Sequence, residues 1–461
     1  MTAGTLAVLA LALIAVGLGL HDLTGKSIWT DEVTSSDHVT SGLRSLAGTV
    51  AGGDPNMGLY YVLLYGWAKV FGHGEVALRS LSVIFGALCV PALAGLGRRL
   101  FGGAVGLLAA LLLAVNPFLI QYEQTARGYA LVVLLVTLSS YFFVRELQEP
   151  SPAGRRGYVL CSAAAVYAHY FAVYVLAAQF LTLLVLDGRQ ALARPARRGG
   201  ITVVVLCVPE MAFALRKGTG GISWIPRPHL ASIPDLFSHL AGSSELAWLL
   251  GALACIGAVA GMRRTGRWRA GLLLVWLLAP VLVTYLISVL GRPLWVPYYL
   301  IVVLPAFLLL AARGVAALPL RALGAVALIA FLVLSGSALS DWYRQPSIDG
   351  FRGATRYLLA RERPGDRIVF DRDYARGGFA YYASLAHRRL PVTITLKRAT
   401  VARESSFRLW VAIREGDVGR ASAQRLESQL RARRGAPLAR HESSNLVVIL
   451  YGPPAGLIAP H

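Results

Sequence analysis

The chain has 461 residues, of which 56% are hydrophobic and only 15% are charged, and its mean hydropathy is +0.58. A charged share so far below the quarter that is typical of soluble globular proteins excludes that class. The 47 glycines and 22 prolines show no repeating period, which excludes a collagen-like chain. Several apolar runs are long enough to cross a hydrocarbon layer of about 30 Å as a helix, so we expect a polytopic α-helical membrane protein.

The formal net charge of +21 does not indicate nucleic-acid binding, because much of it lies in short gaps between the apolar runs. The rest is carried by a polar tail. All four cysteines (Cys89, Cys161, Cys207 and Cys255) lie inside apolar runs and form no close pair. Their positions favour helix packing over a disulfide framework or a zinc site.

The first apolar run, from Thr5 to Leu20, has neither the basic start nor the small-residue cleavage site of a signal peptide, so we expect a retained helix. Further crossings are expected near residues 76–96, 101–119, 127–147, 158–186, 200–215, 244–262, 270–290, 297–313 and 316–336. The run 158–186 is long for one helix and has arginines at both ends. It therefore predicts two short helices that turn near Ala168, His169 and Tyr170, and about 11 crossings in all.

Arginines gather in alternate gaps between these runs, and short basic loops face the cytoplasm in membrane proteins. The clusters are Arg98 with Arg99, Arg155 with Arg156, the four arginines at 189–198, and the four at 263–269. We therefore predict a multi-pass protein of the plasma (inner) membrane with a cytoplasmic N-terminus. The loop 21–75 and everything after Ser340 would lie outside.

Two segments on the predicted outer side differ in hydropathy and pattern from the expected crossings. Within the loop 21–75, residues 57–71 (MGLYYVLLYGWAKVF) are apolar but too short to cross, and they predict a helix at the membrane surface. From residue 341 the hydropathy collapses, and β-rich runs at 367–370, 391–396, 408–413 and 445–450 alternate with helical stretches such as 422–434. We expect a transmembrane domain over 1–340, which includes the loop 21–75, and a small extracytoplasmic α/β domain over 341–461.

The strongest local feature is WTDEV, residues 29–33, shortly after the first crossing. A carboxylate at the membrane surface, Asp31 or Glu32, could remove a proton from a hydroxyl group as it attacks. The same pair could hold a divalent metal ion, or could be two solvated loop charges. A second feature, GGDPN at 52–56, contributes Asp54 to a turn, where it could contact an acceptor or a metal or merely mark the turn.

Three further features lie on the same predicted side. YEQTARGYAL, 122–131, brings Arg127 and Tyr129, and the planar guanidinium could bind a phosphate or simply snorkel. AHYF, 168–171, places His169 and Tyr170 at the tip of the helical turn, where a histidine within an apolar stretch is a functional candidate or a packing residue. GRPLWVPYYL, 291–300, adds Arg292, Tyr298 and Tyr299, or an ordinary interfacial aromatic belt. Their common side unites them into one candidate site for an anionic lipid head group.

In order along the chain, these motifs resemble the GT-C superfamily of polyprenyl-phosphate-sugar glycosyltransferases, in the bacterial branch of protein mannosyltransferases and lipopolysaccharide sugar transferases. The resemblance is carried by WTDEV, by LYYVLLYGWAKVFGHGEVALRSLSVIFG at 59–86, by NPFLIQYEQTARGYAL at 116–131 and by VPYYLIVVLPAFLLLAA at 296–312. The segment DWYRQPSIDGFRGATRYL, 341–358, is similar to a junction in some members. The chain departs from the family at Asn56 and Met57, where paired prolines are common, and at Thr125, where many members carry a glutamate.

This resemblance implies an inverting transfer of a sugar from a polyprenyl phosphate carrier to an acceptor glycan, glycolipid or protein of the cell envelope. Asp31 maps onto the expected general base, and Glu32 would support it or bind acceptor or metal. The carrier phosphate would be bound by a set of basic and phenolic side chains: Arg127, Tyr129, His169, Tyr170, Arg292, Tyr298 and Tyr299. Asp54 and His73 are the acceptor-binding candidates. No cofactor is implied apart from a divalent metal ion.

Two other classes remain open. A lipid or polysaccharide transporter or flippase would also have many helices and charges near a cavity, but such proteins usually place functional charges at the bilayer midplane and show two related halves. A cell-wall assembly partner without catalysis would make the WTDEV pair dispensable. The clustering of charges at one predicted surface and the lack of a second half favour the enzyme.

Overall fold

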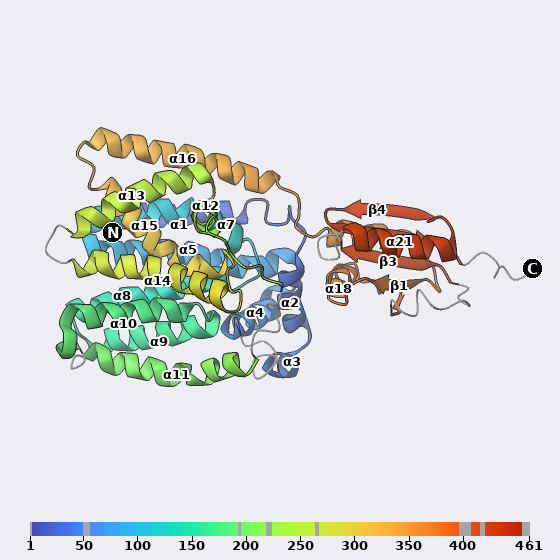
Figure 1. Ribbon diagram of the computed structural model, residues 1–461, viewed down its shortest axis with the longest axis horizontal. Helices are drawn as coiled ribbons and strands as arrows, with labels where there is room; N and C mark the ends of the chain where they lie inside the picture. The colour runs from blue at the N-terminus through green and yellow to red at the C-terminus, as the bar shows by residue number, and fades with distance from the viewer. Residues whose placement is uncertain are drawn as a thin grey trace, which may run out of the picture. The chain divides into compact units, whose positions relative to one another are not determined.

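The computed structural model describes residues 2–48, 56–191, 195–217, 224–262, 267–395, 407–414 and 420–453 (Figure 1). The chain forms two compact units. The helical unit consists of Met1–His21, Ser41–Gly72 and Ala77–Arg344, and the tail unit of Asp22–Thr40, His73–Val76 and Gln345–His461. Each unit is described separately.

The helical unit is built entirely from helices in the part that the structure describes. They are α1 (Ala3–Leu20), α3 (Leu43–Gly48), α4 (Gly58–Phe71), α5 (Glu75–Phe101), α6 (Gly103–Ala114), α7 (Pro117–Glu123), α8 (Tyr129–Gln148), α9 (Pro152–Ala168), α10 (Ala172–Ala191), α11 (Pro195–Lys217), α12 (Ser232–Ala241), α13 (Ser244–Met262), α14 (Trp268–Leu290), the 3-10 helix η3 (Tyr299–Val303), α15 (Leu304–Val315) and α16 (Arg321–Arg344).

Seven of the described helices are long and apolar enough to cross a membrane, and the bent pair α6 and α7 makes an eighth candidate. Two shorter apolar segments, 172–184 and 299–315, accompany them. The chain is therefore a multi-pass membrane protein, as the sequence predicted. The count of about 11 crossings stays a prediction, because the shorter helices do not meet the length criterion.

The long apolar run 158–186 is broken where the sequence indicates a turn. Helix α9 ends at Ala168, His169 has an extended backbone (φ −168°, ψ 131°), and α10 begins at Ala172. A residue with extended dihedrals cannot continue the i to i−4 hydrogen-bond ladder, so the helix stops there. The prediction of two helices in place of one is confirmed. Helix α4 likewise confirms the short helix expected over 57–71.

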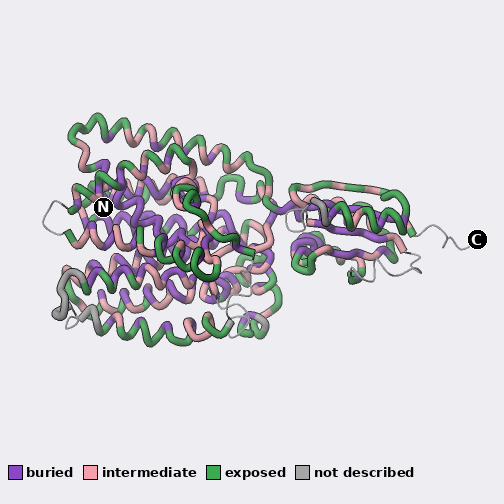
Figure 2. The backbone as a smooth tube through the Cα atoms, in the orientation of Figure 1, coloured by how far each residue is buried: buried purple, intermediate pink, exposed green. Residues whose placement is uncertain are grey.

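Burial divides the helices of this unit into inner and outer ones (Figure 2). Helices α5 and α8 bury most of their residues, whereas α1, α11 and α16 bury few. The outer helices expose large apolar side chains such as Leu13, Val204 and Val333. In water such surfaces would be unfavourable, so they are the surfaces that face the hydrocarbon of a bilayer.

Helices α13 and α15 approach each other closely because glycine faces backbone on both sides. A Cβ atom on Gly257 would lie 2.0 Å from the carbonyl oxygen of Leu310, and one on Gly314 would lie 1.9 Å from that of Leu253. Any side chain at either position would push the two backbones apart. Small residues at the interface are the usual means of close helix packing in membranes.

The ends of α1 and α16, from which the chain passes into the tail unit, are joined through Gln124. The amide nitrogen of this side chain donates to the His21 carbonyl at 2.7 Å, and its oxygen accepts from Trp342 Nε1 at 2.8 Å. The Tyr343 hydroxyl adds a bond to the Leu18 carbonyl at 2.8 Å. Three helices far apart in the sequence thus share one polar junction.

The tail unit contains a five-stranded mixed sheet of order β2-β1-β3-β5-β4. Its strands are β1 (Arg367–Phe370), β2 (Val392–Thr393), β3 (Leu409–Arg414), β4 (Ala439–Ser443) and β5 (Leu446–Tyr451), and its helices are α2 (Thr30–Thr40), α17 (Phe351–Leu359), α18 (Ala375–Leu385) and α21 (Arg420–Arg434). Strand β1 runs parallel to β2 and β3, whereas β5 is antiparallel to β3 and β4. Strands β3 and β5 are almost wholly buried, so this sheet forms the core of the unit.

The expected α/β tail is confirmed, and all four β-rich runs named from the sequence contain a strand. Strand β4 escaped prediction because its sequence, ARHES, is polar and its side chains are only partly buried at the sheet edge. One feature differs from the expected organisation. The sequence predicts that residues 21–75 belong to the transmembrane part, whereas residues 22–40 and 73–76 fold with the tail.

Candidate active site

The helical unit gathers aromatic, basic and imidazole side chains from segments that are far apart in the sequence. We call this set the aromatic cluster, and its members are Tyr61, Tyr122, Arg127, Tyr129, His169, Tyr298 and Tyr299. Helix α4, helix α7, the start of α8, the turn before α10 and the start of η3 each supply at least one of them.

Tyr129 lies at the centre of this cluster and is fully buried. Its ring centroid lies 5.1 Å from that of Tyr122, 5.3 Å from that of Tyr298 and 6.0 Å from that of His169. Tyr299 closes the arrangement, at 5.3 Å from His169 and 5.1 Å from Tyr298. The three tyrosine pairs are edge-to-face and the two pairs with His169 are tilted, and all five separations lie in the range that aromatic pairs prefer, so the rings hold one another in place.

Arg127 is held by tyrosines on two sides. Its Nη1 donates to the Tyr61 hydroxyl at 2.8 Å, and its guanidinium carbon lies 5.9 Å from the Tyr61 ring centroid and 6.0 Å from that of Tyr129. The backbone is fixed as well, because Ser82 Oγ donates to the Arg127 carbonyl at 3.2 Å and pairs with the Tyr60 hydroxyl at 2.8 Å. Helices α4 and α5 thereby set the position of the arginine.

The residue that follows Arg127 must be small. A Cβ atom on Gly128 would lie 3.2 Å from Cβ of Tyr60, 3.3 Å from the Ala168 carbonyl oxygen and 3.4 Å from Cγ of Met57. Contacts of this length leave almost no room for a side chain. The glycine lets α4 and the end of α9 close around the arginine.

His169 is only 1% exposed and lies in the turn between α9 and α10. Its Nδ1 accepts from the backbone N–H of Phe171 at 3.2 Å, so in a neutral ring the proton is carried by Nε2. Burial, and secondarily the charge of Arg127, lowers the pKa of His169 to about 3. The ring is therefore an uncharged donor at neutral pH, and its Nε2 has no partner among the described residues.

The departure of the chain from the paired prolines of the family has a structural counterpart at the start of α4. Met57 has a left-handed backbone with φ of 68°, which a proline ring, fixed near −65°, cannot adopt. The neighbouring Asn56 accepts through Oδ1 from the backbone N–H of Tyr170 at 3.4 Å. Asn56 thus joins the start of α4 to the turn that carries His169.

The remaining phosphate-binding candidates lie at the margins of this arrangement. Tyr170 is half-buried and follows His169 in the same turn. Arg292 is exposed in the segment between α14 and η3, a few residues before Tyr298 and Tyr299. Asp54 lies outside the described residues.

In the tail unit, WTDEV forms the beginning of a helix and not a loop. Asp31 and Glu32 stand in the first turn of α2, where the exposed N–H groups favour negative charge. Glu32 is 1% exposed, and its Oε2 accepts from the backbone N–H of Trp29 at 3.4 Å, which is the glutamate half of a capping box, since Trp29 has no side-chain oxygen to return the bond. Asp31 is half-buried. The two carboxylates therefore differ in environment, and that of Glu32 stabilises the start of α2.

The start of α2 is anchored by Asp349, which is completely buried. Its Oδ2 accepts from the backbone N–H and the hydroxyl of Thr30, at 2.8 and 2.9 Å. Its Oδ1 accepts from Nε of Arg414 at 2.9 Å and from the Asn445 amide at 2.8 Å. One carboxylate thus joins the helix that carries Asp31 to strand β3 and to the turn between β4 and β5.

A second, partly buried network holds residues 73–76 within the tail unit. Arg352 forms an ion pair with Glu75 at 2.7 Å, and the Tyr382 hydroxyl donates to the same carboxylate. The backbone N–H of Ile28 donates to the Tyr382 oxygen at 2.8 Å. Burial, with Glu75 beside it, raises the pKa of Tyr382 to about 12. Tyr382 therefore remains a neutral donor and acceptor at physiological pH.

His73 is exposed, and its backbone carbonyl accepts from the Tyr381 hydroxyl at 3.0 Å. As for a metal ion, no group of three His, Cys, Asp or Glu side chains suited to hold one occurs within the described ranges. The capping role of Glu32 likewise makes the acid pair a poor fit to a dedicated metal site.

Several residues that build these sites are not predicted from the sequence. Tyr61 and Tyr122 belong to the aromatic cluster, and both stood in motifs that carried the family resemblance. Asp349 and Arg352 stood in the segment 341–358, which was noted only as a junction. A buried carboxylate has no sequence signature that separates it from a solvated one.

Residues 57–213 match the family model described as dolichyl-phosphate-mannose-protein mannosyltransferase. Comparison with curated proteins gives no sequence match. The fold resembles that of ArnT from Cupriavidus metallidurans bound to undecaprenyl phosphate, with 14% identity, a TM-score of 0.63 and 100% of each chain covered.

Two further solved structures share the fold. The archaeal oligosaccharyltransferase AglB from Archaeoglobus fulgidus, in complex with an inhibitory peptide and a dolichol-phosphate, has 11% identity and a TM-score of 0.58, and the match covers 97% of this chain and 74% of that one. The arabinofuranosyltransferase AftD from Mycobacteria has 13% identity and a TM-score of 0.53, over 96% of this chain and 41% of that one. At such low identity these likenesses establish the fold.

We predict that replacement of Asp349 destabilises the tail unit. Asp349→Ala would leave the Arg414 guanidinium without its buried counter-charge and the start of α2 without its cap, which costs about 3–5 kcal/mol for a buried pair. Chemical denaturation of the purified protein, followed by tail-unit tryptophan fluorescence, measures the loss. The exposed Asp373→Ala provides the matched control and should change stability by less than about 0.5 kcal/mol. Equal stability of the two variants would contradict the anchoring role.

Proposed function

We propose that the chain is a glycosyltransferase of the GT-C superfamily. It transfers a sugar, with inversion, from a polyprenyl-phosphate-linked donor to an acceptor on the outer face of the membrane. The observation that carries this proposal is the aromatic cluster, in which Arg127 and an uncharged His169 are set among buried tyrosines. The acceptor is a glycan, glycolipid or protein of the cell envelope.

The aromatic cluster has the chemistry that a phosphate diester requires. A guanidinium offers several donors in a planar fork that matches phosphate oxygens. His169 adds an uncharged donor at Nε2, and Tyr129, Tyr298 and Tyr299 contribute phenolic rings. Because the donors and the rings around them are buried or half-buried, each donor acts in a medium of lower dielectric constant than water, where it stabilises a leaving phosphate more strongly. We assign Tyr170 and Arg292 to the same phosphate-binding set.

The carrier class is suggested by the relatives. The structure of ArnT holds undecaprenyl phosphate, and that of AglB holds a dolichol-phosphate. Each ligand joins an anionic phosphate to a long polyprenyl chain. A site that combines Arg127 with a membrane-embedded helical unit fits the same class in this chain.

Asp31 is the general base in this proposal. As the acceptor hydroxyl oxygen forms a bond to the anomeric carbon, its proton passes to the Asp31 carboxylate. The bond between that carbon and the phosphate oxygen breaks on the opposite face, and polyprenyl phosphate leaves with the electron pair. The half-buried Asp31 suits this role better than Glu32, whose carboxylate caps α2. Asp54 and His73 are proposed to contact the acceptor.

The most direct experiment incubates the purified protein with a panel of radiolabelled polyprenyl-phosphate-linked monosaccharides and cell-envelope acceptors. Transfer of label from one donor supports the proposal and identifies the sugar. Transfer from none of them, with movement of labelled lipid between leaflets instead, would indicate a flippase.

We expect Asp31→Asn to abolish transfer while the protein still folds and inserts. The substitution keeps the shape of the side chain and removes its basicity, and a positioned general base contributes about 100-fold or more to the rate. Turnover with the donor identified above is the measurement. Asp37→Asn, on the same helix α2, is the matched control and should retain activity. Unchanged turnover in Asp31→Asn would show that Asp31 is not the general base.

Arg127→Ala should weaken use of the donor much more than use of the acceptor. Loss of a charged hydrogen bond to phosphate raises the apparent donor constant about 10- to 100-fold. Steady-state kinetics with each substrate varied in turn separates the two constants. Arg98→Ala, an exposed arginine at the end of α5, should leave both unchanged. An equal rise of both constants in Arg127→Ala would argue against phosphate binding.

The orientation is proposed from the arginine distribution alone, which places the N-terminus in the cytoplasm and the tail outside. A reporter enzyme that is active only outside the cytoplasm, fused after Ser340, should therefore be active. A reporter that requires the cytoplasm should be inactive at the same site. The opposite pair of results would reverse the topology and remove the outer-face reaction.

A further inference from the structure

Helix α11 has a single acidic residue, Glu210, which is 3% exposed. The buried positions Val203, Cys207 and Glu210 are four and three residues apart, so they form one stripe along the helix. Val204 and Val208, between them, are exposed, because α11 is one of the outer helices. The carboxylate therefore faces the interior of the helical unit and not the bilayer. An ionisable side chain inside a membrane helix is costly and is a candidate functional group.

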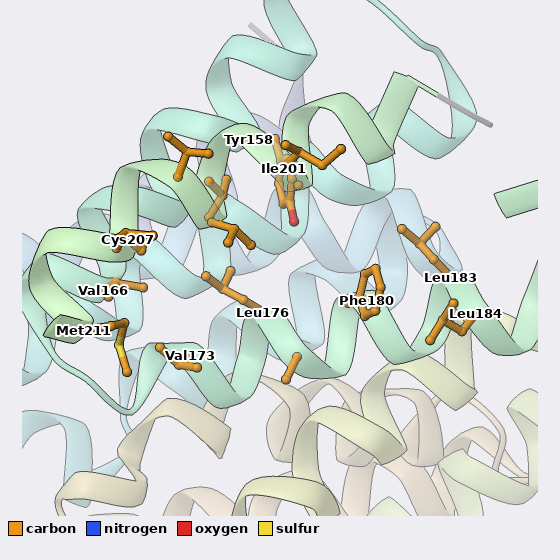
Figure 3. Close-up of a pocket in the computed structure, with 16 residues that line it drawn as sticks. Tyr158, Val166, Val173, Leu176, Phe180, Leu183, Leu184, Ile201, Cys207 and Met211 are labelled. Atoms are coloured by element: carbon orange, nitrogen blue, oxygen red, sulfur yellow. The ribbon is translucent and has the colours of Figure 1, made fainter. Parts of the chain in front are cut away.

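Glu210 lies at the level of the turn between α9 and α10. The next residue, Met211, lines the same cavity as Val166, near the end of α9 (Figure 3). One turn before Glu210, the Leu206 carbonyl accepts from the Tyr167 hydroxyl at 3.0 Å. Because α9 ends at residue 168, these contacts place Glu210 beside the turn that follows α9 and contributes to the aromatic cluster.

The carboxylate of Glu210 also reaches this turn directly. It interacts with the hydroxyl group of Tyr170, the residue after His169. The turn is fixed from a second side, because the backbone N–H of Tyr170 donates to Oδ1 of Asn56 at 3.4 Å. Oε1 of Glu210 is buried and has no hydrogen-bond partner among the described residues. The carboxylate thus has an acceptor oxygen available beside the proposed phosphate site.

Two other glutamates are buried in the described part of the helical unit, and neither has this position. Glu146 caps the start of α9, since its Oε2 accepts from the backbone N–H of Ser151 at 3.0 Å. Glu123 packs against α1, where a Cβ atom on Gly19 would be 2.6 Å from its Oε1. Glu210 is the one of the three that interacts with a member of the proposed phosphate-binding set.

We propose that Glu210 binds hydroxyl groups of the donor sugar and so determines which lipid-linked sugar is used. The inference rests on the proposed function and adds a sugar-binding residue to it. With the phosphate at the aromatic cluster, the sugar attached to it extends by one ring, and one side chain, that of Tyr170, separates the phosphate site from Glu210. An ionised carboxylate only accepts hydrogen bonds, and sugar hydroxyl groups can donate them. A hydroxyl group would supply the donor that Oε1 lacks.

A buried acceptor of this kind discriminates sharply between sugars. A sugar with a hydroxyl group at the matching position satisfies the carboxylate, whereas a sugar without it leaves a buried charge without a donor. Such a site rejects the deoxy sugar much more strongly than an apolar pocket rejects a change of one methylene group. Glu210 therefore acts on the choice of the donor sugar, whereas Arg127 acts on its phosphate.

The test measures binding and not turnover, by native mass spectrometry of the full-length protein in lipid nanodiscs. The ligands are undecaprenyl phosphate, the same lipid carrying each sugar of the donor panel, and the monodeoxy analogues of the sugar that binds most tightly. Glu210→Leu removes both acceptor oxygens at similar volume, and Glu210→Gln keeps one of them. Glu146→Gln is the matched control, because it changes a buried glutamate that lies about 25 Å along α8 from Tyr129.

In the wild type, loss of one particular hydroxyl group should weaken binding at least about tenfold, the effect of a hydrogen bond to a charged group. The same loss should change binding less than twofold in Glu210→Leu and by an intermediate factor in Glu210→Gln. Undecaprenyl phosphate should bind all variants within twofold of the wild type, and Glu146→Gln should discriminate as the wild type does. A purely structural role of Glu210 would weaken every ligand alike, and that result, or undiminished discrimination in Glu210→Leu, would overturn the inference.

The outcome separates this inference from the proposed function. Sugar transfer by the wild type together with full hydroxyl discrimination in Glu210→Leu would leave the glycosyltransferase in place and remove Glu210 from its donor site. Hydroxyl discrimination that depends on Glu210, without transfer to any acceptor, would leave the sugar site in place and remove the transfer reaction.

Discussion

The tail unit depends on one buried carboxylate, that of Asp349, whose two oxygens both accept hydrogen bonds. Asp349 accepts from the start of α2, from Arg414 at the end of β3 and from Asn445. A carboxylate without exposure to water is tolerable only when it is hydrogen-bonded and matched by a cation, and here both conditions hold. Because α2 begins at this anchor, the position of Asp31 within the tail unit follows from a residue more than 300 positions later in the chain.

In the helical unit, aromatic rings surround the buried polar groups. A guanidinium and an imidazole placed among apolar helices would be costly without partners, and each is accommodated differently. Arg127 keeps its charge and is contacted by Tyr61 and Tyr129, whereas burial lowers the pKa of His169, so its ring is uncharged. The result is a cluster with one full positive charge and a neutral imidazole donor beside it.

The outer surface of the same unit follows the physics of the bilayer. Large apolar side chains face outward on α1, α11 and α16. Helices α9, α10 and α11 line an apolar groove in that surface, and two of its residues, Val166 and Val173, lie within about one helical turn of His169.

The sequence by itself determined the membrane class, the break at His169, the short helix after residue 57 and the mixed α/β tail. These follow from hydropathy, periodicity and turn residues, which act over a few positions. It also selected Arg127, Tyr129, His169, Tyr298 and Tyr299, which the structure gathers into one cluster. Only the tertiary structure decided that Tyr61 holds the arginine, that Glu32 caps α2 and that residues 22–40 fold with the tail. Such contacts join positions far apart in the chain, and no local pattern of residues records which buried donor will meet which acceptor.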